Sequence, residues 1–333
     1  MTDLGWTMLS MVNANRFISK GAIPLVLVAY AVYVWIDHAH ATHRNDEWDG
    51  DVKVHLQNVK NSRSVDALVF GGSNAAYSLS AEYLSYNTGL SWYNASLDSE
   101  LRTISKYKNF VRELSARIDR TKVRYVVYSN IFPYITGQID RAKREDGEGI
   151  KPRGSVLGDI VQHISGRLRQ VSRGSQHNSP GDIVSERQRD SFGDIIFDTV
   201  KCAHAANPSY EREDEDASAH FLVDEAIFYA SVFPNASILT VLPSEYYGVA
   251  SFDDSIFEQN LRTKFYSLLR QYHFERMVKI IFQPPYSSIT QVCDSQLHAD
   301  EDGRAWRTEN LIESIQPTIS RRRAFLHRQV NHL

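Results

Sequence analysis

The sequence has few cysteines and little excess charge of either sign. Only Cys202 and Cys293 occur among 333 residues, and 37 basic residues face 40 acidic ones, so the net charge is -3. The spacing of the two cysteines is not that of a metal site. A near-neutral chain lacks the basic excess that a nucleic-acid-binding protein carries. We therefore expect no nucleic-acid partner, no metal site and no cofactor.

Two alternatives are open for the cysteine pair. Outside the cytosol Cys202 and Cys293 can form a disulfide, but two free buried thiols are the more common outcome, and we expect the thiols. The chain is 42% hydrophobic, which is enough to bury a substantial core in one large domain or two ordinary ones.

The chain also lacks an uncharged segment of full bilayer length. The closest is 21–36, which is bracketed by Lys20 and Asp37 and is slightly shorter than the ~17–25 residues of a membrane helix. Basic residues before it predict a cytoplasmic segment 1–20 and a transmembrane anchor at 21–36, followed at 37–64 by a linker or a membrane-proximal helix. The alternative is a signal peptide cleaved near Ala41. Under both interpretations the main domain is exported, and we expect it at the inner membrane, facing the periplasm or the outside.

Apolar runs alternate with amphipathic segments along the rest of the chain, which is typical of a doubly wound α/β domain with a parallel sheet. We expect this domain at 65–333, with a polar insertion at about 137–220 that serves as a lid or docking element. The expected strands are 65–70, 91–96, 123–128, 237–242 and 278–282, and the expected helices are 80–84, 101–118, 256–272 and about 300–315.

Polar side chains follow three of the expected strands. The first strand ends in Gly71-Gly72, which allow a tight turn and deliver Ser73, followed by a loop or short helical turn. Asn94 with Ser96, and Asn130, follow the next two strands. The carboxyl ends of parallel strands meet at one edge of an open sheet, where ligands bind. A fourth piece, Asp294 and His298, lies on a loop before the last helix.

Together these motifs resemble the SGNH/GDSL hydrolase superfamily, and the branch that contains membrane-anchored polysaccharide O-acetyltransferases. The resemblance spans about 65–315 without the insertion. It implies a flavodoxin-like three-layer α/β/α fold with a central parallel sheet, here preceded by one transmembrane helix. It also implies Ser73 as nucleophile, His298 as base and Asp294 as the group that orients His298. It gives oxyanion or substrate-binding roles to four further residues, which are Asn130, Asn94, Ser96 and Gly72.

The sequence departs from the family pattern in three places. Gly72 stands where the family name implies an aspartate. Ala95 or Ser96 replaces the usual glycine of the second motif. Asp294 precedes His298 by four residues instead of three, which leaves open a Ser–His dyad or a different carboxylate.

The resemblance implies an enzyme that moves an acetyl or other acyl group onto hydroxyls of a cell-envelope or secreted polysaccharide through a serine acyl-enzyme. A multispanning membrane protein is the expected acyl-transfer partner. Two alternatives stay open: a carbohydrate or lipid esterase of the same fold, and a non-catalytic glycan-assembly protein.

Overall fold

The computed structural model describes residues 49–60, 64–97, 104–130, 137, 139–140, 189–197, 202, 204, 213–244, 246, 255–293 and 298–330. The chain divides into two compact units, Met1–Gly50 and Asp51–Leu333. The sheet and the candidate site described below belong to the second unit. The segments 1–20 and 21–36 lie outside the described residues. Within the described part, no helix has both the length and the apolar character needed to cross a bilayer.

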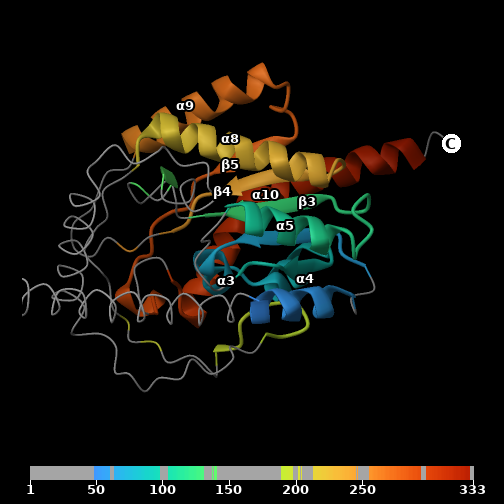
Figure 1. Ribbon diagram of the computed structural model, residues 1–333, viewed down its shortest axis with the longest axis vertical. Coiled ribbons are helices and arrows are strands. Elements are labelled where there is room, and N and C mark those ends of the chain that lie inside the picture. Colours follow the sequence, from blue (N-terminus) through green and yellow to red (C-terminus); the bar gives the residue numbers. More distant parts are fainter. Residues whose placement is uncertain are drawn as a thin grey trace, which may run out of the picture. The chain divides into compact units, whose positions relative to one another are not determined.

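A five-stranded parallel sheet forms the centre of the second unit (Figure 1). Its strands run in the order β2-β1-β3-β4-β5, which is the flavodoxin-like order. The strands are β1 Ala67–Gly71, β2 Trp92–Asn94, β3 Tyr125–Ser129, β4 Ser237–Val241 and β5 Val278–Ile281. The predicted parallel sheet and the position of each strand are therefore confirmed.

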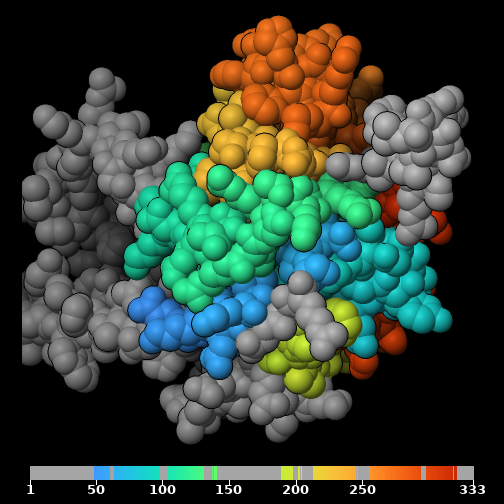
Figure 2. All heavy atoms as spheres, turned by 90° about the vertical axis from the view of Figure 1, so that its right-hand side faces the viewer, coloured from blue at the N-terminus to red at the C-terminus, as the bar shows by residue number. Residues whose placement is uncertain are grey.

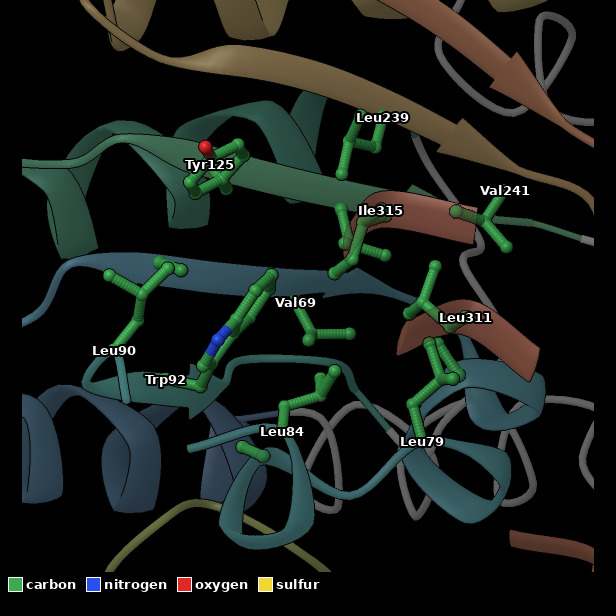
Figure 3. Packing of buried hydrophobic residues seen from close by; sticks show 14 of the residues in the cluster. Val69, Leu79, Leu84, Leu90, Trp92, Tyr125, Leu239, Val241, Leu311 and Ile315 are labelled. Carbon is green, nitrogen blue, oxygen red and sulfur yellow. The ribbon is translucent and has the colours of Figure 1, made fainter. Parts of the chain in front are cut away.

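Helices cover both faces of the sheet. They are α3 Ser73–Ser78, α4 Ala81–Thr88, α5 Ile104–Ser115, α8 Glu215–Val232, α9 Ser255–Gln271, the short 3₁₀ helix η4 Ile289–Gln291 and α10 Glu301–Val330. On one face, Val69 and Trp92 pack with Leu84 of α4 and with Leu311 and Ile315 of α10 (Figure 3).

The other face of the sheet carries aromatic side chains that meet α8. The ring of Phe70 lies 5.2 Å from that of Tyr229, and Tyr128 lies 5.1 Å from the same ring. Successive residues of β1 thus point to opposite faces and both faces are buried, as expected for a strand in a covered parallel sheet. The helix α9 packs on α8 from the outside (Figures 1 and 2).

Part of the range predicted as a linker, 37–64, belongs to the folded unit. Residues 49–60 form a helix, and its His55, Leu56 and Val59 are buried. Its Asp51 accepts two hydrogen bonds from Arg189, at 2.8 and 3.1 Å. The apolar side chains of this helix are sparse, so its amphipathic pattern is weak in the sequence.

The described part of the predicted insertion, 137–220, also packs into the domain. The segment 189–197 lies beside the helix 49–60 (Figure 2). It supplies the buried carboxylate of Asp194, and α8 begins inside the range, at Glu215. The acidic run before α8 has a local structural role, because Asp214 caps this helix by accepting from the N–H groups of Asp216 and Ala217.

Candidate active site

The turn between β1 and α3 presents Ser73 at the carboxyl edge of the sheet. Gly71 pairs with Ser129 on β3, and a Cβ atom at Gly71 would lie 2.1 Å from the Ser129 carbonyl oxygen. Only glycine allows this approach. Gly72 then forms the N-cap of α3, and its carbonyl accepts from the N–H groups of Ala75 and Ala76. Ser73 opens the helix with a half-buried side chain.

His298 lies against this serine. Its Nε2 atom is 2.8 Å from the Ser73 hydroxyl oxygen, although the two residues are 225 positions apart in the chain. The predicted meeting of Ser73 and His298 is therefore present in the structure. Asp294, the predicted orienting carboxylate, lies outside the described residues, so its pairing with His298 stays a prediction.

The loop that carries His298 is fastened at its base. Cys293 donates its N–H to the His298 carbonyl at 2.8 Å, and Val292 forms an antiparallel bridge with Ala299. Cys293 is also bonded to Cys202. The expectation of free thiols was wrong, because the fold brings two positions 91 residues apart together. The disulfide attaches the His298 loop to a segment that follows the 189–197 stretch.

An aromatic ring that the sequence analysis missed lies flat on His298. Tyr77 stacks on the imidazole with ring centroids 5.0 Å apart and an interplanar angle of 14°. Tyr77 is one helical turn after Ser73 and is 1% exposed, so its position is fixed by packing. The spacing of four residues from the candidate nucleophile was the only signal for it in the sequence.

A buried arginine donates hydrogen bonds to the turn that carries Ser73 and to the end of β3. Arg307 is fully buried, donates to the Asn74 carbonyl at 2.9 Å and donates to Ser129 Oγ at 2.8 Å. Gln283 accepts from Arg307 Nε and donates back to its carbonyl. The guanidinium therefore joins α10 to the residue after Ser73 and to the end of β3. An arginine on an amphipathic helix is expected to face solvent, so the burial of Arg307 could not be predicted from the sequence.

The N–H donors of Asn94 and the backbone N–H of Ser96 have partners within the protein. Both amide N–H groups of Asn94 are used, by the Leu79 carbonyl and by Asp194 Oδ1, each at 3.0 Å. Its Oδ1 accepts from the Ser96 N–H. The backbone N–H groups from Asn94 to Leu97 all have protein acceptors. These N–H groups hold the stretch in place, and a role of Asn94 or Ser96 in binding an oxyanion or substrate stays a prediction.

Asn130 lies beside the serine turn. It follows β3 directly after Ser129, which is paired with Gly71, and it is 2% exposed. Its predicted role as an oxyanion donor stays a prediction. The backbone N–H groups of Ser73 and Asn74 are the first of α3, where helical geometry provides no acceptor. The turn therefore presents these two backbone donors beside the Ser73 hydroxyl.

The geometry defines a class of chemistry. A serine hydroxyl with an imidazole nitrogen at 2.8 Å is the arrangement of an activated nucleophile, in which the imidazole takes the proton as the oxygen attacks. Among the described residues, no group of three or more histidine, cysteine, aspartate or glutamate side chains is arranged to bind a metal ion. The Ser73–His298 pair is therefore a candidate for an activated serine nucleophile with its base.

Comparisons with known proteins add a distant structural likeness. No family model and no curated protein matches the sequence. Among solved structures, an acetyl xylan esterase from Butyrivibrio proteoclasticus is similar at 9% identity and a TM-score of 0.37. Two structures of a family two carbohydrate esterase from Clostridium thermocellum with cellohexaose, one an active-site mutant, are similar at 10% and 9% identity and TM-scores of 0.40 and 0.41.

These alignments cover 78% of this chain and 65–66% of the esterase chains. The chain thus spans just under two thirds of the length of these structures. At these identities and TM-scores the likeness carries no argument about function, which has to come from the site itself.

Proposed function

We propose that the protein is an SGNH-type acyl-transfer enzyme in which Ser73 is the nucleophile and His298 the base. The observation that carries this proposal is the 2.8 Å distance between Ser73 Oγ and His298 Nε2. The two residues come from distant parts of the chain. The distance lies in the range of ~2.6–3.2 Å between heavy atoms at which a general base takes a proton directly from a hydroxyl.

The reaction follows from this geometry. His298 Nε2 takes the Ser73 proton while Oγ attacks the carbonyl carbon of an ester. The negative charge on the carbonyl oxygen is held by the Ser73 N–H and by Asn130. The imidazolium then returns the proton to the departing alkoxide, which leaves an acyl-serine. A second hydroxyl, deprotonated by the same imidazole, attacks the acyl-serine and releases Ser73.

The acceptor decides between a transferase and an esterase. We propose a hydroxyl of a cell-envelope or secreted polysaccharide as acceptor, with an acetyl or other acyl group delivered by a multispanning membrane partner. The apolar segment 21–36 supports this version, because an anchor at the inner membrane would hold the domain near such a partner in the periplasm or outside. With water as acceptor, the same site is a carbohydrate or lipid esterase.

The test is hydrolysis of p-nitrophenyl acetate by the full chain, with and without a glycan acceptor. We expect Ser73→Ala to lower the rate by roughly 10³-fold or more, because the nucleophile is lost. His298→Ala should lower the rate by about 10²-fold or more, through loss of the base. Matched controls are Ser231→Ala and His220→Ala, both exposed on α8 and remote from the dyad.

Acceleration by glycan, with acetyl appearing on the glycan, indicates a transferase. Release of free acetate at an unchanged rate indicates an esterase. If the native chain and Ser73→Ala are equally inert, the proposal is wrong and a non-catalytic glycan-assembly protein is the remaining candidate.

A further inference from the structure

An open cleft of about 600 Å³ lies between α4 and the first turns of α10. It is separate from the dyad, since neither Ser73 nor His298 lines it. The residues that matter for its chemistry are Glu82, Tyr83 and Tyr86 of α4, Phe192 of the 189–197 segment, and Glu301 and Arg304 of α10. A cleft of this size accommodates a ligand of several rings.

Aromatic rings supply the apolar part of the cleft. Tyr86 is 88% exposed, which is unusual for so large a side chain with no partner to cover it among the described residues. Tyr83 is held in place by a 2.7 Å hydrogen bond from its hydroxyl to Glu309. Phe192 is half-buried opposite them. Sugar rings present apolar C–H faces, and flat aromatic side chains are the surfaces on which such faces pack.

Charged groups supply the polar part. Glu82 and Glu301 are exposed carboxylates, which accept hydrogen bonds from hydroxyls. Arg304 donates from one nitrogen to the Ile195 carbonyl at 2.7 Å, and its guanidinium lies 4.4 Å over the ring of Phe197. This arginine is therefore held rigidly, and a guanidinium has five N–H donors to distribute. Acceptors, donors and aromatic rings in one cleft match a ligand that is rich in hydroxyls.

The cleft is joined to the dyad by a chain of ring contacts. Arg304 lies over Phe197, Phe197 meets Tyr77 at 6.2 Å, and Tyr77 stacks on His298. Arg304, which lines the cleft, is thus connected to His298 through two intervening side chains. A molecule as small as acetate or p-nitrophenol has no need of this space.

We propose that the cleft between α4 and α10 is a subsite for the glycan chain whose hydroxyl or ester reacts at Ser73. The proposal rests on the function proposed above, but binding in the cleft does not require chemistry at the serine. The two proposals can therefore fail separately.

Binding is measured first, by calorimetry on Ser73→Ala, which removes turnover. The probes are three neutral hexasaccharides with β-1,4 links, made of glucose, xylose or N-acetylglucosamine. We expect at least one probe to bind, and Tyr86→Ala in the same background to weaken its affinity roughly tenfold, as loss of a central aromatic contact does. The control is Tyr272→Ala, a half-exposed tyrosine just after α9 that is not in the cleft.

Kinetics then separate the two proposals. With acetylated hexasaccharide as substrate, Tyr86→Ala and Glu82→Gln should raise KM at least tenfold more than they do for p-nitrophenyl acetate, whereas Tyr272→Ala should change neither. If p-nitrophenyl acetate is hydrolysed but no probe binds, or Tyr86→Ala binds as tightly as the parent, the cleft proposal is wrong. If a probe binds through Tyr86 while no ester is turned over, the cleft proposal stands and the acyl-transfer proposal fails.

Discussion

Tyr77 fixes the plane of the candidate base. Its ring covers one face of the His298 imidazole, and the lone pair of Nε2 lies in the imidazole plane, so the stack aims the nitrogen at Ser73. The stack thus helps to orient the imidazole, which is one of the tasks of the carboxylate in a Ser–His–Asp triad. The contact with Tyr77 acts on the imidazole directly, with or without Asp294.

We therefore predict that Tyr77→Phe retains most of the esterase rate, because the stack remains. Tyr77→Leu should lower kcat by about tenfold or more through misorientation of the base, with KM for p-nitrophenyl acetate little changed. Equal losses in the two variants would mean that the hydroxyl and not the ring matters.

Gly71 is irreplaceable for a steric reason. A methyl group at this position would overlap the Ser129 carbonyl oxygen and lie 2.6 Å from Ala75 Cβ. We predict that Gly71→Ala lowers the free energy of unfolding by about 2–3 kcal/mol or more, as measured by urea denaturation. Gly50→Ala, where nothing lies within 4 Å, is the matched control and should be neutral or slightly stabilising.

At the scale of elements, one carboxylate joins three parts of the chain. Asp194 accepts from the Ser80 hydroxyl at 2.9 Å, from the N–H groups of Ala81 and Glu82, and from the Asn94 amide. It thus caps α4 and fixes the turn after β2, while being 2% exposed. A buried carboxylate with four donors leaves all four unsatisfied when it is removed.

We predict that Asp194→Ala costs about 3 kcal/mol or more of unfolding free energy, measured by urea denaturation. Glu113→Gln, which breaks an exposed ion pair with Arg117, should cost well under 1 kcal/mol. A similar small loss for both variants would show that the 189–197 segment is not part of the stable fold.

The disulfide is the second long-range connection between elements. It closes a loop with a sequence separation of 91 residues, so its loss should destabilise the domain by about 3–4 kcal/mol. We predict that the double variant Cys202→Ser/Cys293→Ser also loses esterase activity at temperatures where it is still folded, because Cys293 bounds the His298 loop. Activity assays beside circular dichroism melting curves check this. Full activity in the folded variant would show that His298 keeps its position without the disulfide.

These elements also show what the sequence could and could not predict. Each strand was found because buried parallel strands are apolar runs, and Ser73 was found because it ends one of them after two glycines. The helix 49–60 lies in the range expected to be a linker or a membrane-proximal helix, and the segment 189–197 lies in the expected insertion. Beside the buried side chains of the helix, both are held by the hydrogen-bonding side chains Asp51, Arg189 and Asp194, whose partners are far away in the chain. Periodicity carries no information about such contacts.

The same limit applies within the candidate site. Ser73 and His298 were paired through a family resemblance, and their distance agrees with that pairing. The amide of Asn94 donates to protein acceptors, which the sequence does not show, because an asparagine at the end of a strand looks alike whether its amide faces the crevice or the protein interior. The helix α10 was expected to end near 315 but continues to Val330, past Pro317.

At the scale of the whole molecule, one buried histidine makes the fold sensitive to acid. His55 is fully buried, 3.0 Å from the Tyr93 hydroxyl and 3.1 Å from the Ser96 carbonyl. Burial, with a smaller contribution from the Arg189 charge, lowers the pKa of His55 from 6.5 to about 3. Between about pH 6.5 and 3, His55 is therefore protonated in the unfolded chain and neutral in the folded chain.

The contribution of His55 to stability is fully present above pH 6.5 and is lost as the pH falls toward 3. We predict a loss of up to about 1.4 kcal/mol per pH unit from this group. The measurement is urea denaturation of the native chain and of His55→Gln at pH 7.5, 6 and 5. The stability difference between them should narrow as the pH falls. A constant difference would mean that His55 is protonated in the folded protein.

The order of synthesis sets when the two halves of the dyad can meet. The serine leaves the ribosome early, while its base lies 225 residues later, close to the end of the printed sequence. A nascent or truncated chain that stops before this histidine therefore holds an unactivated alcohol and is chemically silent. Under the proposed function, turnover begins only after this histidine has been synthesised, so chains that stop before it pose no hazard to the esters that they encounter.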